Sequence, residues 1–407
     1  MSITRNRYAI LACGTIVLMV LGLIYAWSIF VAPLEGEFGW SRSQTSLTFS
    51  ISMVAWSFGM LANGWLAWRL GLRARFAIGI ALIAAGFALT SLASALPQLY
   101  ICYGLLCGFG TGLCYNLWTA ATFAHFPDRA GFASGVLLMG FGLGSLILGS
   151  AAAALIHSGL GWRGAFVVLA IIVVIVALAA TPFLHRPDES MQRHYAKRAN
   201  DGLELSGSQM VREPSFWVFV VWRVHVMGAA AAIIAQAASL MADIGASTVF
   251  TTMAVGVLSI GNGCGRPIIG IVYDRIGRDR TMVLLPACGI VIGIALAAAY
   301  MIGSIPGLAI ALFLEGVLYG GYSTINTSFV RTTYGQRSVA MNIGISSLTL
   351  MPFNFLFPLI LGSLFVVTGG YGVGLIALPI LAAISLVAGI FCGPAIRKMN
   401  SRHIDEG

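Results

Sequence analysis

Residues 270–278 read Gly-Ile-Val-Tyr-Asp-Arg-Ile-Gly-Arg, and residues 64–73 read Gly-Trp-Leu-Ala-Trp-Arg-Leu-Gly-Leu-Arg. Both stretches contain Gly-x-x-x-x-Arg-x-Gly followed closely by another arginine, and each comes after a long apolar segment. The first copy carries Trp68 where the second carries Asp274. This internal repeat predicts that the chain consists of two related halves.

Composition indicates that lipid surrounds most of the chain. The 407 residues are 58% hydrophobic and only 9% charged, whereas soluble domains are about a quarter charged. Apolar stretches long enough to cross a bilayer recur from end to end. We expect spans at residues 8–34, 44–68, 76–95, 98–123, 131–156, 164–184, 215–242, 248–273, 281–302, 307–330, 339–367 and 372–393. The prediction is an all-α membrane protein with twelve transmembrane helices.

A single long polar segment divides the chain near its middle. Residues 185–213 are rich in charge and poor in apolar side chains, which is typical of a flexible linker. We therefore expect an N-terminal six-helix bundle at 1–184, a cytoplasmic linker at 185–213 and a C-terminal six-helix bundle at 214–407. In such a protein the substrate site is expected between the bundles at mid-depth.

The basic residues predict the orientation of the chain. Of the 23 Lys and Arg, only Arg42 and Arg163 fall on the side opposite the termini, and only Arg223 and Arg266 fall within spans. Positive charge accumulates on the cytoplasmic side of membrane proteins, so both termini are predicted to be cytoplasmic. The net charge of +9 therefore reflects topology and predicts no nucleic-acid partner. We expect a multi-pass protein of a bacterial inner membrane, whose first span is too long for a removable signal peptide.

No enzymatic motif is visible in the sequence. There is no nucleophile elbow, phosphate-binding loop or metal-ligand cluster, and the seven cysteines lie in spans or at a span end. We expect neither enzymatic activity nor a cofactor or bound metal. A sensory role is the alternative to transport.

Ionisable residues inside the spans point to the functional site, because they are costly in lipid and usually face a cavity or a partner. They are Arg223, His225, Arg266 and Glu315. Arg266 has Asn262 one helical turn before it on the same face, and glycines flank both. A guanidinium binds a carboxylate in two places and stays charged, so Arg266 is expected to bind an anionic substrate. The alternative is an ion pair with an acidic residue on another helix, such as Glu315.

The repeat resembles the cytoplasmic signature of the major facilitator superfamily. The resemblance implies the fold of that superfamily, with two six-helix bundles. It also implies a cytoplasmic gate motif formed by Gly270, Asp274, Arg275, Gly277 and Arg278. Trp68 departs from the pattern of the first copy, so a symmetric gate is not expected.

Further segments are similar to the monocarboxylate porters and the related bacterial oxalate:formate antiporters. The matching segments are residues 25–41, 126–135, 262–267, 319–321 and 342–344. The resemblance implies that Arg266 binds the substrate carboxylate and that Tyr25, Tyr115 and Tyr319 lie near the ligand. A tyrosine supplies an apolar wall and one hydroxyl, which suits a small organic anion. For each tyrosine, packing between helices or an aromatic belt is the alternative.

Departures from these families bear on the coupling ion. Leu350 stands where the oxalate antiporters carry a lysine, and Asn262 stands where animal monocarboxylate porters carry an aspartate. His225 and Glu315 are the remaining candidates for a coupled proton, although His225 could equally be a neutral, hydrogen-bonded residue. Arg223 could snorkel to the membrane surface or serve a second carboxylate.

The sequence thus predicts a secondary transporter of small organic anions that works by alternating access. The first expectation is a monocarboxylate such as lactate or pyruvate moved with a proton. Exchange of anions, as in oxalate:formate antiporters, is the second. Export of drugs or metabolites is the third, because the chain is rich in aromatic residues.

Overall fold

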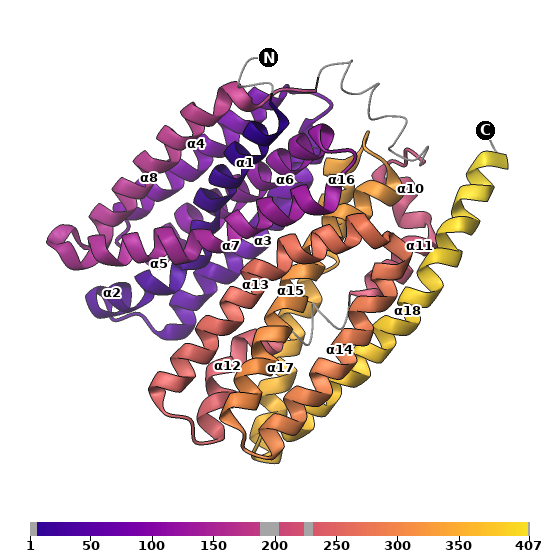
Figure 1. The fold of residues 1–407 in the computed structure, drawn as a ribbon. Coiled ribbons are helices and arrows are strands. Elements are labelled where there is room, and N and C mark those ends of the chain that lie inside the picture. The colour runs from indigo at the N-terminus through magenta and orange to yellow at the C-terminus, as the bar shows by residue number, and fades with distance from the viewer. Residues whose placement is uncertain (1–5, 188–202, 224–230, 406–407) are drawn as a thin grey trace. The chain divides into compact units, whose positions relative to one another are not determined.

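The structure is a computed structural model that describes residues 6–187, 203–223 and 231–405. Every regular element within these ranges is helical (Figure 1). Serine hydroxyls cap several helix starts: Ser41 accepts from the backbone N–H of Gln44, and Ser304 accepts from that of Gly307. Such caps satisfy N–H groups that have no partner within the helix.

The helices fall into two compact units. The first takes its described residues from the ranges Met1–Asp128, Val136–Ala199 and Ser338–Ile345. Its α-helices are α1 (Arg7–Leu21), α2 (Ser28–Phe38), α3 (Arg42–Leu66), α4 (Leu72–Ser91), α5 (Leu96–Leu99), α6 (Gly108–His125), most of α7 (Ala130–Leu155) and α8 (Gly161–Ala180). A 3-10 segment, Gly22–Trp27, joins α1 to α2, and a π-helical segment, Tyr100–Cys107, joins α5 to α6.

The second unit takes its described residues from the ranges Arg129–Gly135, Asn200–Arg337 and Ser346–Gly407. It contains α10 (Gly207–Arg212), α11 (Pro214–Trp222), α12 (Ala231–Asp243), α13 (Thr248–Ile276), α14 (Arg278–Met301), α15 (Ile305–Tyr334), α17 (Met351–Thr368) and α18 (Gly372–Asp405). Residues 130–135, the first turns of α7, belong to this unit. The end of α16 (Val339–Leu348) belongs to it too, whereas the start of α16 belongs to the first unit.

Each of the twelve expected spans corresponds to helical structure in the described residues. Several spans are composite, because α1–α2, α5–α6, α11–α12 and α16–α17 each occupy the range of one expected span. Seven stretches of the described residues are by themselves long and apolar enough to cross a membrane, and one of them, Ala130–Phe183, contains both α7 and α8. Residues 188–202 of the expected linker lie outside the described residues.

The last two expected spans differ from the helices in the structure. The span expected at 339–367 is divided, with α16 ending at Leu348 and α17 beginning at Met351. Pro352 is the second residue of α17, a position where its missing N–H costs no hydrogen bond. The last span continues to Asp405, beyond its expected end at 393, because a helix that leaves the lipid can extend with polar residues.

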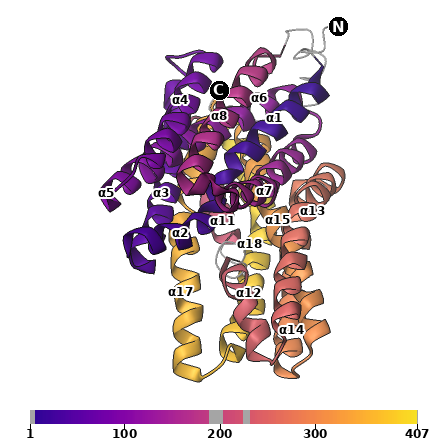
Figure 2. The same cartoon turned by 90° about the vertical axis from the view of Figure 1, so that its left-hand side faces the viewer.

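Two helix pairs dominate the packing of the second unit. Helix α13 packs along α15, and α14 packs along α18, as both views of the ribbon show (Figure 1 and Figure 2). The pair of α13 and α15 holds Asn262, Arg266, Glu315 and Tyr319.

Candidate substrate-binding site

Arg266 lies within α13 and is almost completely buried, with only 7% of its surface exposed. Its Nε and Nη2 atoms each lie 3.4 Å from Oδ1 of Asn262, one helical turn earlier. The amide oxygen therefore orients the guanidinium from within the same helix. Asparagine brings no negative charge, so this contact leaves the positive charge of Arg266 uncompensated by Asn262.

Glycines allow α13 and α15 to touch along their backbones. A Cβ atom on any of these glycines would collide with backbone atoms of the facing helix. They are Gly261 and Gly265 on α13 and Gly316 and Gly320 on α15. Each pair has the four-residue spacing typical of close helix contacts in membranes. Tyr319, next to Gly320, is close enough for the Arg266 guanidinium to act electrostatically on its hydroxyl.

The first turns of α7 support the backbone of α13 beside Arg266. Gly135 lies against the backbone of Arg266 and Pro267, where a Cβ atom would not fit. The hydroxyl of Thr324 on α15 donates to the Arg266 carbonyl at 3.2 Å, and the hydroxyl of Ser134 donates to the Thr324 carbonyl at 3.3 Å. The first turns of α7 and the facing part of α15 thus hold the backbone at Arg266, a feature that the sequence did not reveal.

Asp274 caps the start of α7. Its Oδ1 accepts from the backbone N–H of Gly131 at 2.9 Å, and its Oδ2 accepts from that of Phe132 at 2.8 Å. Gly270 and Gly131 lie backbone to backbone, which brings the carboxylate within reach. A carboxylate at a helix N-terminus satisfies free N–H groups and complements the helix dipole. The role of this contact in a gate remains a prediction.

The remaining residues of the predicted gate motif form the turn between α13 and α14. Gly277 has φ of 83°, a backbone conformation that favours glycine. Nε of Arg278 pairs with Oδ1 of Asp279 at 2.9 Å, and its Nη1 donates to the Thr333 hydroxyl at 3.4 Å. Arg275 is exposed.

The first copy of the repeat makes a related backbone contact without the carboxylate. Gly64 lies against the backbone of Met341 in the first turn of α16, as Gly270 lies against Gly131. At the position of Asp274 this copy has Trp68, whose side chain is exposed. The helix approach is therefore repeated, whereas the cap on the helix start is not.

Tyr25 and Tyr115 belong to an aromatic cluster in the first unit. The ring of Phe141 lies between them, with centroids 5.3 Å from Tyr25 and 5.0 Å from Tyr115. Trp56 packs on Tyr115 at 5.3 Å, and Phe49 packs on Tyr25 at 6.2 Å. Tyr115 is buried, whereas 44% of Tyr25 is exposed. The sequence indicated the two tyrosines but not the three rings that hold them.

Arg223 is buried among uncharged groups at the end of α11. Its Nη1 donates to Oδ1 of Asn326 at 2.6 Å and to the Ser346 carbonyl at 3.1 Å, and its Nη2 donates to the Thr349 hydroxyl at 2.7 Å. The guanidinium also lies over the ring of Phe219. Only 1% of the residue is exposed, so the expectation that Arg223 could snorkel to the surface is wrong.

Glu315 lies in α15 with 2% of its surface exposed. Its Oε1 is buried and has no hydrogen-bond partner among the described residues. Tyr322 lies close enough for Glu315 to act electrostatically on its hydroxyl. His225, the other residue expected to bind a proton, lies outside the described residues.

Within the ranges that the structure describes, no three His, Cys, Asp or Glu side chains gather as metal ligands. The structure thus brings Arg266, Asn262 and Tyr319 together in the second unit, and Tyr25 and Tyr115 together in the first.

Comparisons with known proteins agree with the helical architecture. The sequence profile of the Major Facilitator Superfamily matches residues 11–351. An oxalate:formate antiporter of Oxalobacter formigenes is 26% identical over 338 residues, which are 82% of this chain and 80% of that protein. Monocarboxylate transporter 12 of Rattus norvegicus is 32% identical over 146 residues, or 35% of this chain and 29% of that protein. The solved proton:xylose symporter XylE superposes with a TM-score of 0.72 at 16% identity, covering 96% of both chains.

Proposed function

Since this chain belongs to the Major Facilitator Superfamily, and is therefore a multi-pass membrane transporter with twelve spans and not an enzyme, we propose that it carries small organic anions. The favoured substrate is a monocarboxylate of the lactate or pyruvate type, moved together with a proton by alternating access. We place it in a bacterial inner membrane with both termini in the cytoplasm. The predicted superfamily fold is confirmed, whereas substrate and coupling rest on the residues discussed next.

The observation that carries the proposal is the buried Arg266 beside Asn262. A fixed positive charge inside a membrane is costly and is usually kept for a ligand or a partner. The Asn262 amide orients the guanidinium without neutralising it. A carboxylate arriving at Arg266 would bind the guanidinium through two parallel hydrogen bonds. Tyr319 beside it offers a hydroxyl and an apolar ring.

The expected competing partner of Arg266 is Glu315. Oε1 of Glu315 has no hydrogen-bond partner in the described part of the chain, which speaks against an ion pair through that atom. A buried carboxyl group without a cation beside it is more stable in its neutral form. We therefore assign the coupled proton to Glu315, with His225 as the second candidate.

The geometry of Arg223 favours a monoanion over a dianion. Both Nη atoms of Arg223 already donate to Asn326, Ser346 and Thr349. A second substrate carboxylate would have to displace these acceptors. Leu350, at the position where the resemblance places a lysine, adds no charge either.

Exchange of anions is the second candidate. It is supported by the relative that is named an oxalate:formate antiporter, which matches over most of both chains. Substrate-loaded Arg266 would be neutralised in both directions of exchange, so this mechanism requires no proton. Export of drugs or metabolites is the third candidate, and the buried cation argues against it for neutral or cationic compounds.

The test is uptake of labelled lactate, pyruvate, acetate, formate and oxalate into proteoliposomes, with and without an inward proton gradient. We expect gradient-stimulated uptake of a monocarboxylate, and an increase in KM of about tenfold or more in Arg266→Lys, because lysine loses the bidentate contact. The control is Arg75→Lys, since Arg75 is also buried and donates to an asparagine, Asn63, at 2.6 Å.

The other possible outcomes distinguish between the candidate functions. Uptake that requires an anion inside the vesicles and ignores the proton gradient would select exchange. An Arg266→Lys variant that folds like Arg75→Lys but transports carboxylates like the wild type would remove Arg266 from the site. Absence of carboxylate uptake by folded wild-type protein would overturn the proposal.

A further inference from the structure

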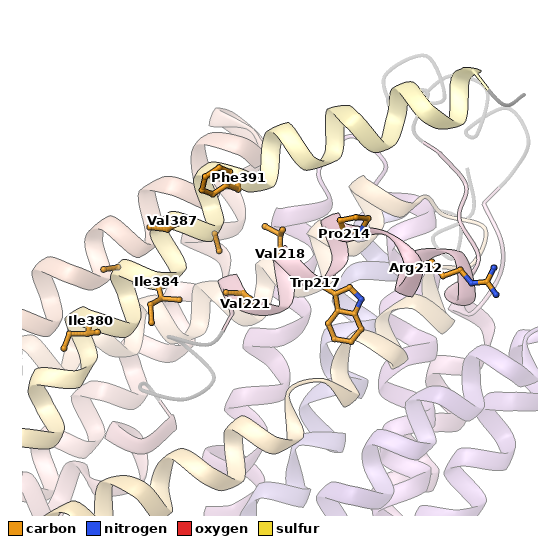
Figure 3. Close-up of a pocket in the computed structure, with 11 residues that line it drawn as sticks. Arg212, Pro214, Trp217, Val218, Val221, Ile380, Ile384, Val387 and Phe391 are labelled. Atoms are coloured by element: carbon orange, nitrogen blue, oxygen red, sulfur yellow. The ribbon is translucent and has the colours of Figure 1, made fainter.

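An apolar groove of about 950 Å³ runs between α11 and α18 of the second unit (Figure 3). Ten of its eleven lining residues are apolar, and they include Ile380, Ile384, Val387 and Phe391 on α18. On α11 the wall is formed by Trp217, Val218 and Val221, as Figure 3 shows. Sites for small polar ligands carry several converging polar groups. This groove is therefore suited to a hydrocarbon chain and not to a small carboxylate.

The length of the groove matches one leaflet of a bilayer. Ile380 to Phe391 is about 16 Å of helix at ~1.5 Å per residue. Half of a ~30 Å hydrocarbon core is about 15 Å. Trp217 lies near the polar end, and its indole N–H donates to the carbonyl of Val211 at 2.8 Å. Tryptophan with its polar edge satisfied is typical of the boundary between lipid and water.

The polar end of the groove is basic. Arg212, the one charged lining residue, lies at that end in Figure 3 and is exposed. The adjacent acid, Glu213, is already paired with Arg402 at 3.0 Å and with His403 at 3.2 Å. Arg212 therefore has no ion pair within the described residues. Its charge is available to an anion.

A second basic residue lies on the same face of α18. Counting from Phe391, the helical period places Lys398 two turns further along the stripe that lines the groove. Lys398 is exposed and forms no ion pair with any residue that the structure describes. By contrast, the smaller groove of about 290 Å³ along α17 is lined by Leu356, Ile360, Ser363, Leu364 and Val367, and has no basic residue.

We propose that the groove between α11 and α18 binds an anionic phospholipid, with one acyl chain along the apolar wall and the phosphate at Arg212 and Lys398. In the proposed orientation this lipid belongs to the cytoplasmic leaflet, whose anionic lipids attract basic residues near the membrane surface. The site is separate from Arg266 and requires no assumption about the transported substrate.

The test is native mass spectrometry of the full-length protein, titrated with phosphatidylglycerol or phosphatidylcholine of identical acyl chains. We expect tighter binding of phosphatidylglycerol, and about fivefold weaker binding of it in Arg212→Gln. Arg73→Gln is the control for charge, because Arg73 is an exposed arginine of the first unit. Arg212→Lys, which keeps the charge, should retain the preference.

A second pair of variants tests the apolar wall. Ala383→Phe fills the groove from an exposed position and should weaken phosphatidylglycerol binding, whereas Ser363→Phe, in the groove along α17, should not. Equal affinity of the wild type for both lipids would overturn the proposal, as would equal losses in Arg212→Gln and Arg73→Gln. A wild-type dimer that Ala383→Phe converts to monomers would assign the groove to a second copy of the chain instead.

Discussion

Nη1 of Arg223 lies 2.6 Å from Oδ1 of Asn326, so an uncharged amide solvates this buried cation. The same guanidinium reaches the Ser346 carbonyl, two residues before the end of α16. Carbonyls in the last turn of a helix have no partner within it, and a cation there also complements the helix dipole. Arg223 therefore stabilises the end of a helix that stops inside an expected span.

This role predicts a stability effect without a change in specificity. Arg223→Met would leave the acceptors on Asn326 and Ser346 without their donor, at a cost of about 1–3 kcal/mol. Titration with sodium dodecyl sulfate, followed by circular dichroism, measures the loss. The ratio of monocarboxylate to oxalate uptake should remain that of the wild type. A selective loss of oxalate uptake would show instead that Arg223 binds a second carboxylate.

The glycine contacts between α13 and α15 predict different outcomes for two neighbouring glycines. A Cβ on Gly265 would collide with the backbone of Val317, so Gly265→Ala should force the helices apart and sharply lower transport. Gly263, on the same helix, has nothing within 4 Å of its Cβ position. Gly263→Ala should be tolerated, and it gains up to about 1 kcal/mol of helix propensity. Uptake rates and thermal unfolding in detergent measure the effects of the two substitutions. Equal effects would contradict the close contact of Gly265 with Val317.

Glu315→Gln tests the assignment of the coupled proton. Glutamine mimics the protonated carboxyl group permanently, so the variant should lose uptake driven by a proton gradient. It should retain counterflow, in which labelled substrate exchanges with unlabelled substrate and no net proton movement is needed. Glu315→Asp keeps a titratable group and should recover part of the driven uptake. Driven uptake by Glu315→Gln at the wild-type level would move the assignment to His225.

The cap on α7 predicts opposite effects at the two copies of the repeat. Asp274→Ala removes the acceptors for Gly131 and Phe132 and should cost about 0.5–2 kcal/mol. Trp68→Asp should add a carboxylate near the start of α16, where Gly64 already contacts Met341, and stabilise it by up to about 1 kcal/mol. Thermal unfolding of both variants in detergent checks the signs. Destabilisation by Trp68→Asp would show that the two copies position residue 68 and residue 274 differently.

Local patterns in the sequence predicted the helical spans and the pairing of Asn262 with Arg266. Hydropathy indicates the spans directly. The pairing of Asn262 with Arg266 requires only that residues four apart share a helix face. The division between α16 and α17 was not predicted, although Pro352 was a signal for a helix start.

Contacts between distant parts of the chain could not be read in this way. Phe141 joins Tyr25 to Tyr115, and Asn326 solvates Arg223, across separations that no periodicity reports. The backbone contact of Gly135 with Arg266 is also hidden, because a glycine in a span has the same appearance whether it faces lipid or another helix. These contacts depend on how helices pair, which hydropathy does not specify.

The glycines at the contact of α13 with α15 also constrain how this protein can evolve. Gly265 and Gly320 have no side chain left to shorten, so mutation at these positions can only add volume. Substitutions at these two positions therefore cannot bring the two helices closer together, and selection would remove most of them. Adaptation to a new substrate must instead proceed through neighbours with exchangeable side chains, such as Asn262 and Tyr319.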